Sequence, residues 1–117
     1  MISIFSAIEV LGPYIIEKAL AFTITVNLAD KPFGDSSVWI EAQGPNGYKH
    51  GDWYNWSSIR TGVESGTVTL NLPDSAFPTG EEYRICASSK VGFNVIFPNC
   101  VRSIISGGDA TVNISLR

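Results

Sequence analysis

Apolar and polar residues alternate with a period of two along much of the chain. The clearest example runs from Gly66 to Ser89, where GTVTLNLP is followed by DSAFPTG and then by EEYRICASS. Alternation of this kind is typical of a β-strand that buries one face. Pro73 cannot donate to a sheet ladder, and the Pro-, Asp-, Ser- and Gly-rich segment after it predicts a turn. Two strands joined by such a corner are how a β-sandwich carries its chain from one sheet to the other.

The same alternation predicts further strands on either side of this pair. The apolar sets that share a face are Phe22, Ile24, Val26 and Leu28; Val38, Ile40 and Ala42; Val91, Phe93, Val95 and Phe97; and Ala110, Val112, Ile114 and Leu116. The aromatic segment 48–62 matches neither the strand nor the helix period, and we interpret it as partly loop. With turn signals between the segments, about seven to nine strands predict an all-β fold, an Ig-like two-sheet β-sandwich that spans residues 13–117 as one domain.

Residues 1–12 precede this domain as an N-terminal arm. Ile2, Ile4, Ile8 and Val10 form its apolar face, and Gly12-Pro13 predicts a hinge after it. Burying four such side chains stabilises by on the order of 6–12 kcal/mol before entropy is subtracted. We therefore predict a donor strand that adds to a sheet edge of a neighbouring copy. Two alternatives stay open: the arm is the first strand of its own sandwich, or residues 2–22 form a helix.

Composition indicates a protein that is secreted or displayed on a surface. Apolar residues make up 44% of the 117 positions, which excludes a disordered chain. Charged residues make up only 16%, so Ser, Thr, Asn and Gly fill the surface instead. The net charge of −3 and the absence of a basic run argue against a nucleic-acid partner, and we expect no membrane span. The predicted location is extracellular or at the cell surface.

The two cysteines, Cys86 and Cys100, predict a disulfide bond. Two cysteines are too few for a zinc site without histidine partners, and a disulfide implies an oxidising compartment. Cys86 shares the outward face of Arg84, so the bond is expected outside the core. A tight hairpin at residues 89–92 would place Cys86 opposite Val95, so the bond requires a wider connection. Two free thiols are the alternative.

Two triplets fit the N-glycosylation acceptor pattern, Asn55-Trp56-Ser57 and Asn113-Ile114-Ser115. By parity, Asn113 lies on the outward face of its strand, which is what glycosylation requires. Asn55 lies in the polar aromatic segment. We predict a glycan on Asn113 and also on Asn55.

With its strands in place, the chain resembles the transthyretin-like and carboxypeptidase-regulatory-like family of Ig-like modules. The matching segments are Thr25-Val26-Asn27, Asp30-Lys31-Pro32, Ser36-Ser37-Val38-Trp39-Ile40, Gly44-Pro45-Asn46-Gly47, Thr61-Gly62, Gly66-Thr67-Val68-Thr69-Leu70, Gly80-Glu81-Glu82-Tyr83-Arg84-Ile85 and Ala110-Thr111-Val112-Asn113-Ile114. The resemblance covers residues 20–117. It implies a module without catalysis of its own, of the kind found in secreted enzymes, adhesins and surface fibres. The Trp-rich segment 48–60 is longer than the family pattern.

No constellation of residues predicts catalysis, and we predict no cofactor or metal site. His50, the only histidine, lies in a polar turn without a sequence-near Ser or Asp partner in a recognisable motif. The acidic residues of the predicted loops lack EF-hand spacing and are interpreted as solvated. They are Asp30, Asp35, Asp52, Asp74 and Asp109.

Three tryptophans, Trp39, Trp53 and Trp56, are the candidate contact residues for a protein interface or a sugar. Trp39 points away from the core by parity. Exposed aromatic rings bind sugar rings or become buried at interfaces. The alternative is that the three rings pack beneath the long loop as a satellite cluster.

These observations give a first hypothesis and an alternative. The first is a structural subunit of an extracellular filament or pilus, a homopolymer assembled by donor-strand complementation through residues 1–12. The alternative is a secreted carbohydrate-binding or adhesive β-sandwich module. A small secreted enzyme is a third possibility, which the lack of a catalytic constellation disfavours.

Overall fold

A computed structural model of the chain describes residues 22–32, 37–91, 94–95 and 98–117, and the side chains of Val91, Asn94 and Val95 are not part of that description. The strands are β1 (Phe22–Ala29), β2 (Ser37–Gln43), β3 (Lys49–Asn55), β4 (Gly66–Leu72), β5 (Glu82–Val91), β6 (Asn94–Val95), β7 (Asn99–Ile104) and β8 (Ala110–Ser115). Three short helical segments are η1 (Pro45–Gly47), α3 (Trp56–Ile59) and η2 (Asp74–Ala76). The predicted all-β class is therefore confirmed.

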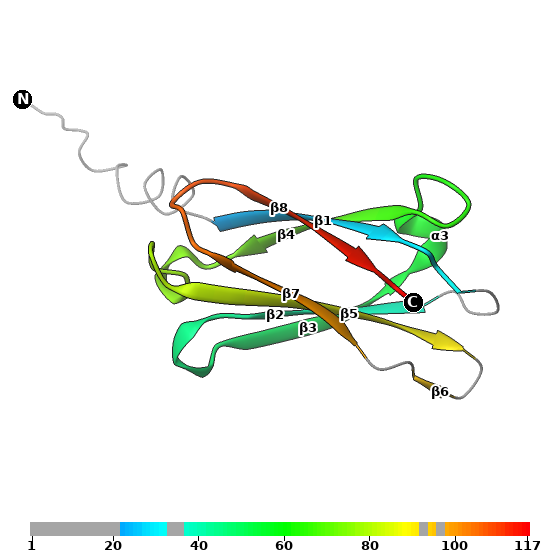
Figure 1. Ribbon diagram of the computed structural model, residues 1–117, viewed down its shortest axis with the longest axis horizontal. Coiled ribbons are helices and arrows are strands. Elements are labelled where there is room, and N and C mark those ends of the chain that lie inside the picture. The colour runs from blue at the N-terminus through cyan, green and yellow to red at the C-terminus, as the bar shows by residue number, and fades with distance from the viewer. Residues whose placement is uncertain (1–21, 33–36, 92–93, 96–97) are drawn as a thin grey trace, which may run out of the picture.

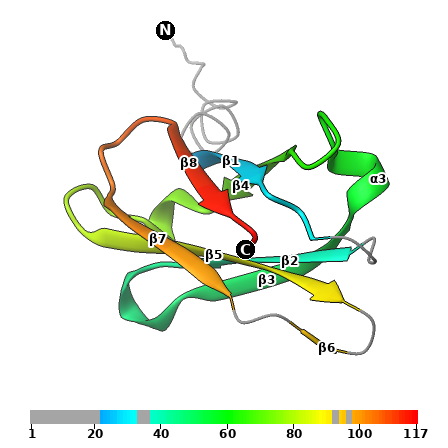
Figure 2. The ribbon, with the colours of Figure 1, turned by 45° about the vertical axis from the view of Figure 1, so that its right-hand side comes forward.

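The strands form two packed sheets, as predicted (Figures 1 and 2). The first sheet has three strands in the order β4-β1-β8, with β1 antiparallel to β4 and parallel to β8. The second has the order β3-β2-β5-β7 with antiparallel neighbours, and the two-residue β6 pairs with the end of β5. The sandwich arises because each strand has one apolar face and the two sets of apolar faces cover each other.

The core lies between the sheets and comes from the alternating residues. In β1, Phe22, Ile24, Val26 and Leu28 are buried while the residues between them are half-buried. Val38, Ile40 and Ala42 of β2 and Tyr83, Ile85 and Ala87 of β5 contribute from the opposite sheet. Val112, Ile114 and Leu116 close the core at the end of the chain. The apolar sets predicted for these strands are thus the core-facing sets.

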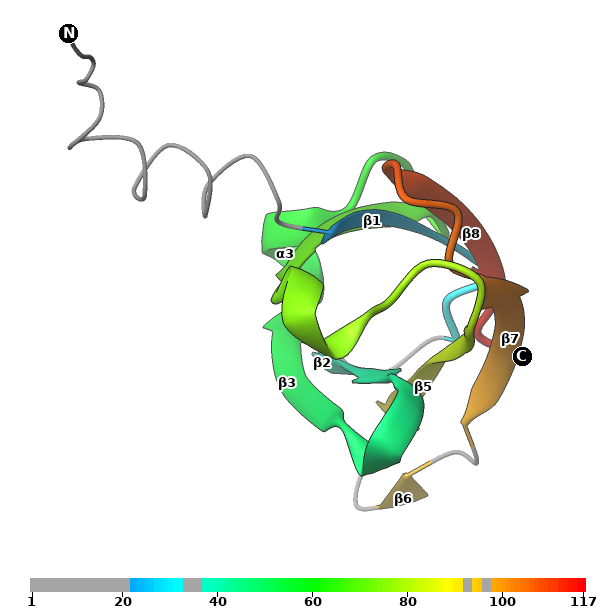
Figure 3. The same cartoon turned by 90° about the vertical axis from the view of Figure 1, so that its left-hand side faces the viewer.

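The corner between β4 and β5 carries the chain from the first sheet to the second (Figure 3). It contains η2, in which Phe77 N–H bonds to the Asp74 carbonyl at 3.0 Å. Phe77 is 1% exposed, and its ring lies 5.3 Å from the rings of Phe22 and Tyr48, centroid to centroid. The corner is therefore fixed by an aromatic side chain that enters the core as well as by its turn residues.

The segment interpreted as partly loop forms the edge strand β3 and the helix α3. β3 pairs with β2 over its whole length, from Lys49 to Asn55. Most of its side chains are exposed, so the strand carries no apolar alternation to reveal it. Asn55 then begins α3, because its side-chain oxygen accepts a hydrogen bond from the Ser57 N–H at 3.1 Å.

Trp56 is the first residue of α3, and it is only 9% exposed. Its ring lies over Gly66 and 5.8 Å from the Nζ of the buried Lys31. The predicted surface role of Trp56 is wrong, because the residue belongs to the packed interior. Trp56 instead follows the alternative stated above, in which a tryptophan ring packs inside the protein and not on its surface.

The predicted disulfide between Cys86 and Cys100 is present, and the two residues face each other directly across β5 and β7. The connection is not wider but lies later in the chain than residues 89–92, because β5 continues to Val91 and Val91 pairs with Asn94. Lys90 pairs with Val95 and Ala87 with Asn99, so the returning chain uses one residue more than β5 between these pairs. This extra residue brings Cys100 into register with Cys86.

Several expectations fall outside the described residues. They concern the arm of residues 1–12, with Ile2, Ile4, Ile8 and Val10, and the side chains of the 91–97 segment. Within the described part of the chain, no helix is long and apolar enough to cross a membrane.

Candidate ligand-binding face

The outward side of the second sheet carries aromatic, cationic, acidic and amide side chains close together, and we call it the outer face. Because alternate residues of a strand share a face, the cross-strand register defines its members. They are Trp39, Glu41 and Gln43 of β2; Lys49, Gly51 and Trp53 of β3; Glu82, Arg84, Cys86 and Ser88 of β5; and Cys100, Arg102 and Ile104 of β7. The outer face therefore combines an aromatic end and a cationic end.

At the aromatic end, Trp39 and Trp53 are directly opposite on neighbouring strands. Their ring centroids are 5.4 Å apart with an interplanar angle of 58°, and Trp53 is 47% exposed. The prediction that Trp39 points away from the core is confirmed by its alternation with the buried Val38 and Ile40. The two rings form an accessible aromatic pair.

Gly51 makes room for this pair. A Cβ atom at Gly51 would lie 2.2 Å from Cζ2 of Trp39, so any side chain there would displace the ring. The Trp39 ring therefore lies close against the backbone of β3 at Gly51, next to Trp53. Nothing in the alternation of the sequence pointed to Gly51, because the close approach depends on the pairing of β2 with β3.

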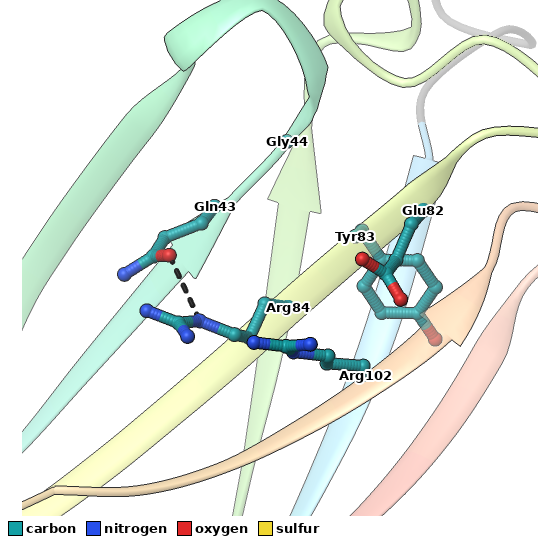
Figure 4. Close-up of a pocket in the computed structure, with 6 residues that line it drawn as sticks. All are labelled: Gln43, Gly44, Glu82, Tyr83, Arg84 and Arg102. Carbon is teal, nitrogen blue, oxygen red and sulfur yellow. Dashed lines mark hydrogen bonds between the residues drawn. The ribbon is translucent and has the colours of Figure 1, made fainter.

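At the other end, Gln43, Arg84 and Arg102 form a row across β2, β5 and β7. They line a pocket of about 260 Å³ together with Gly44, Glu82 and Tyr83 (Figure 4). Figure 4 shows the Arg102 side chain extending from β7 toward that of Arg84. Lys49 continues the row on β3, directly opposite Gln43.

Two hydrogen bonds hold Gln43 and Arg84 in place. Gln43 Nε2 donates to Glu41 Oε2 at 2.7 Å, and Arg84 Nε donates to Gln43 Oε1 at 3.0 Å. The first bond fixes which end of the Gln43 amide faces Arg84, and the second holds the guanidinium. Within the described residues the ion pair present joins Arg117 to Glu64, so neither pocket arginine is neutralised by a carboxylate there.

The other predicted positions do not converge on a site. His50 is exposed on β3, and Asp30, Asp52, Asp74 and Asp109 are exposed and dispersed. Asp35 lies outside the described residues. No group of three or more His, Cys, Asp or Glu side chains in the described ranges could hold a metal ion.

The two predicted glycosylation sites are both exposed. Asn113 lies on the outward side of the first sheet, where its Oδ1 accepts a hydrogen bond from Asn27 Nδ2 at 3.2 Å. Asn55 Oδ1 accepts bonds from both the backbone N–H and the hydroxyl of Ser57. Accessibility is thus satisfied at both positions, while the modification itself stays a prediction.

Tyr54 lies beside Trp53 but points toward the core side of β3. Burial raises the pKa of the Tyr54 phenol above 10.0, and the nearby Asp52 charge raises it further. The charged residues of the outer face are its arginines, lysine and glutamates.

Comparison with known proteins adds no identification. No family model matches the chain, and neither a curated protein nor a solved structure matches it. The function must therefore be inferred from the outer face itself.

Proposed function

We propose that this chain is a carbohydrate-binding module of an extracellular or surface-displayed protein, and that the outer face is its binding surface. The observation that carries the proposal is the Trp39–Trp53 pair, with Trp53 47% exposed on a sheet face. Aromatic rings on a flat sheet stack against the apolar faces of sugar rings. The disulfide supports an oxidising compartment. The fold is compatible with the transthyretin-like family of modules, to which we assign it as part of this proposal.

The polar residues beside the pair supply the hydrogen bonds that a sugar needs. Hydroxyl groups both donate and accept, so a binding face needs acceptors and donors together. Glu41 and Gln43 provide acceptors, while Arg84 and Arg102 provide donors, and the hydrogen bond to Gln43 orients those of Arg84. A surface that binds an apolar protein partner would not need the polar row of Gln43, Arg84 and Arg102.

Replacing Trp53 is expected to weaken binding to a recognised polysaccharide about tenfold, roughly 1.4 kcal/mol, because a central aromatic anchor is lost. Gly51→Ala should weaken it similarly, since both tryptophans remain but the Trp39 ring loses its place. Affinity electrophoresis in gels that contain single polysaccharides measures the change. Val63→Ala is the control, because Val63 is an exposed large hydrophobic side chain outside the outer face, at 78%. Equal retention of Trp53→Ala and the unaltered protein would refute the proposal.

A second proposal is a filament subunit that assembles through residues 1–12. The observation that favours it is the open edge of the first sheet, where β4 is the outer strand in the described part of the chain. An extended arm with alternating apolar residues can add to such an edge by ladder hydrogen bonds. In this proposal the partners are copies of the same chain, and the glycans proposed on Asn113 and Asn55 cover the outside of the polymer.

For the filament proposal, a chain that begins at Pro13 is expected to stay monomeric while the full chain polymerises, as seen by negative-stain microscopy. A synthetic peptide of residues 1–12 should bind and stabilise the shortened chain. The same peptide with Ile4 and Ile8 replaced by Ser is the control, because its apolar face is interrupted. Polymers of the shortened chain like those of the full chain would end the donor-strand proposal.

A further inference from the structure

We propose that the pocket at the cationic end of the outer face binds the carboxylate of an acidic sugar, so that the module recognises a uronic-acid-containing polysaccharide. This inference rests on the proposed carbohydrate-binding function and specifies its ligand. It is carried by the two arginines of the pocket, Arg84 and Arg102, which are directly opposite on β5 and β7.

The first argument is charge. Two guanidinium groups share a pocket of about 260 Å³, and in the described part of the chain no carboxylate lies within ion-pair distance of either one. Both side chains are cationic, so an anion that enters the pocket can interact with the two charges together. The net charge of the whole chain is −3, so this cationic pair stands out from its surroundings and would attract an anion locally.

The second argument is preorganisation. Arg84 donates its Nε hydrogen to Gln43, whose amide is in turn held by Glu41. With Nε engaged, the terminal nitrogens of Arg84 are the donors that face a ligand. A guanidinium held in this way recognises a planar carboxylate by two parallel hydrogen bonds and loses little freedom on binding.

The third argument is spacing. Gln43 follows Trp39 by four residues on β2, which is roughly 13 Å along a strand. That length spans more than one sugar ring, so a chain stacked on the tryptophan pair reaches the pocket with another of its sugars. Between the two ends lie Gly51, the disulfide and Glu41, whose carboxylate is held by Gln43. The outer face therefore fits an oligosaccharide.

The acidic residue of the pocket limits the charge of the ligand. Glu82 lines the pocket with the two arginines, so the three side chains together carry one net positive charge. This matches one carboxylate and disfavours a densely sulfated sugar. Glu82 can also accept a hydrogen bond from a neighbouring sugar hydroxyl.

The test compares two probes by calorimetry on the full chain. Short hyaluronan oligosaccharides alternate a uronic acid with a neutral sugar, and chitin oligosaccharides of equal length contain only the neutral sugar. We expect hyaluronan to bind about tenfold more tightly than chitin oligosaccharides, because its carboxylates form charge-assisted hydrogen bonds with the arginines. This preference should decrease as the salt concentration is raised. Arg84→Gln and Arg102→Gln should each bring the ratio of the two affinities close to one. Arg60→Gln, which removes an equal charge outside the outer face, should leave the ratio unchanged.

Each remaining outcome contradicts a distinct claim. If both probes bind equally and the arginine variants change nothing, the acidic-sugar inference fails while the carbohydrate-binding function stands. If dextran sulfate binds more tightly than hyaluronan and all three arginine variants weaken it alike, the attraction is a general one for polyanions, and the pocket is not a carboxylate site. If no probe of any kind binds, the proposed function fails and the inference with it.

Discussion

Phe77→Ala is expected to lower the free energy of unfolding by about 4 kcal/mol, the usual cost of removing a fully buried phenylalanine. Phe77 is 1% exposed, and its ring contacts those of Phe22, on the first sheet, and Tyr48, beside η1. It therefore joins the corner, the first sheet and the turn after β2 at one point. Gly44 also lies against the ring, since a Cβ atom there would be 3.1 Å from two of its carbons.

Urea unfolding followed by tryptophan fluorescence measures this loss. Val63→Ala is the control, because Val63 is 78% exposed and its truncation should change stability by less than about 0.5 kcal/mol. A loss below about 1 kcal/mol for Phe77→Ala would mean that the corner is not anchored through the core.

Removing the disulfide is expected to cost about 3 kcal/mol, because the bond closes a short loop and restricts the unfolded chain. Cys86 and Cys100 are separated by 14 positions. The double variant Cys86→Ala and Cys100→Ala is preferable to a single one, since it leaves no lone thiol to form bonds between molecules. The bond also holds the edge strand β7, so Arg102 should lose part of its fixed position along with it.

Unfolding in urea with and without a reductant checks this expectation. The reductant should destabilise the unaltered protein to the level of the double variant and leave the double variant itself unchanged, which makes the latter an internal control. Equal stability of the two proteins without reductant would show that the bond contributes nothing to folding.

The core strands could be predicted from the sequence because burial of one face leaves a direct pattern. In β1, Ile24 and Val26 alternate with threonines, and no other period fits that stretch. The corner before β5 could be predicted equally well, since Pro73 and Gly80 have strong conformational preferences. The disulfide followed from the cysteine count and the outward parity of Cys86.

The edge of the second sheet could not be predicted in the same way. β3 is exposed on most of its length, so its side chains were not selected for burial and carry no period. Trp56 was misplaced for a related reason, because a four-residue helix capped by Asn55 is too short to show a helical pattern. The row of Gln43, Arg84 and Arg102 was also missed, since Arg84 and Arg102 become neighbours only through the register of β5 and β7.

The parallel pairing of β1 with β8 determines how this domain carries mechanical load. The two strands are joined over six paired positions, from Ile24 with Ala110 to Ala29 with Ser115. Because they run in the same direction, the chain enters the sheet at one end of this ladder and leaves it at the other (Figure 1). Tension applied through the two ends pulls the strands along their length in opposite directions, so the hydrogen bonds of the ladder are strained together and not opened singly. A domain pulled through both ends therefore resists rupture in this geometry.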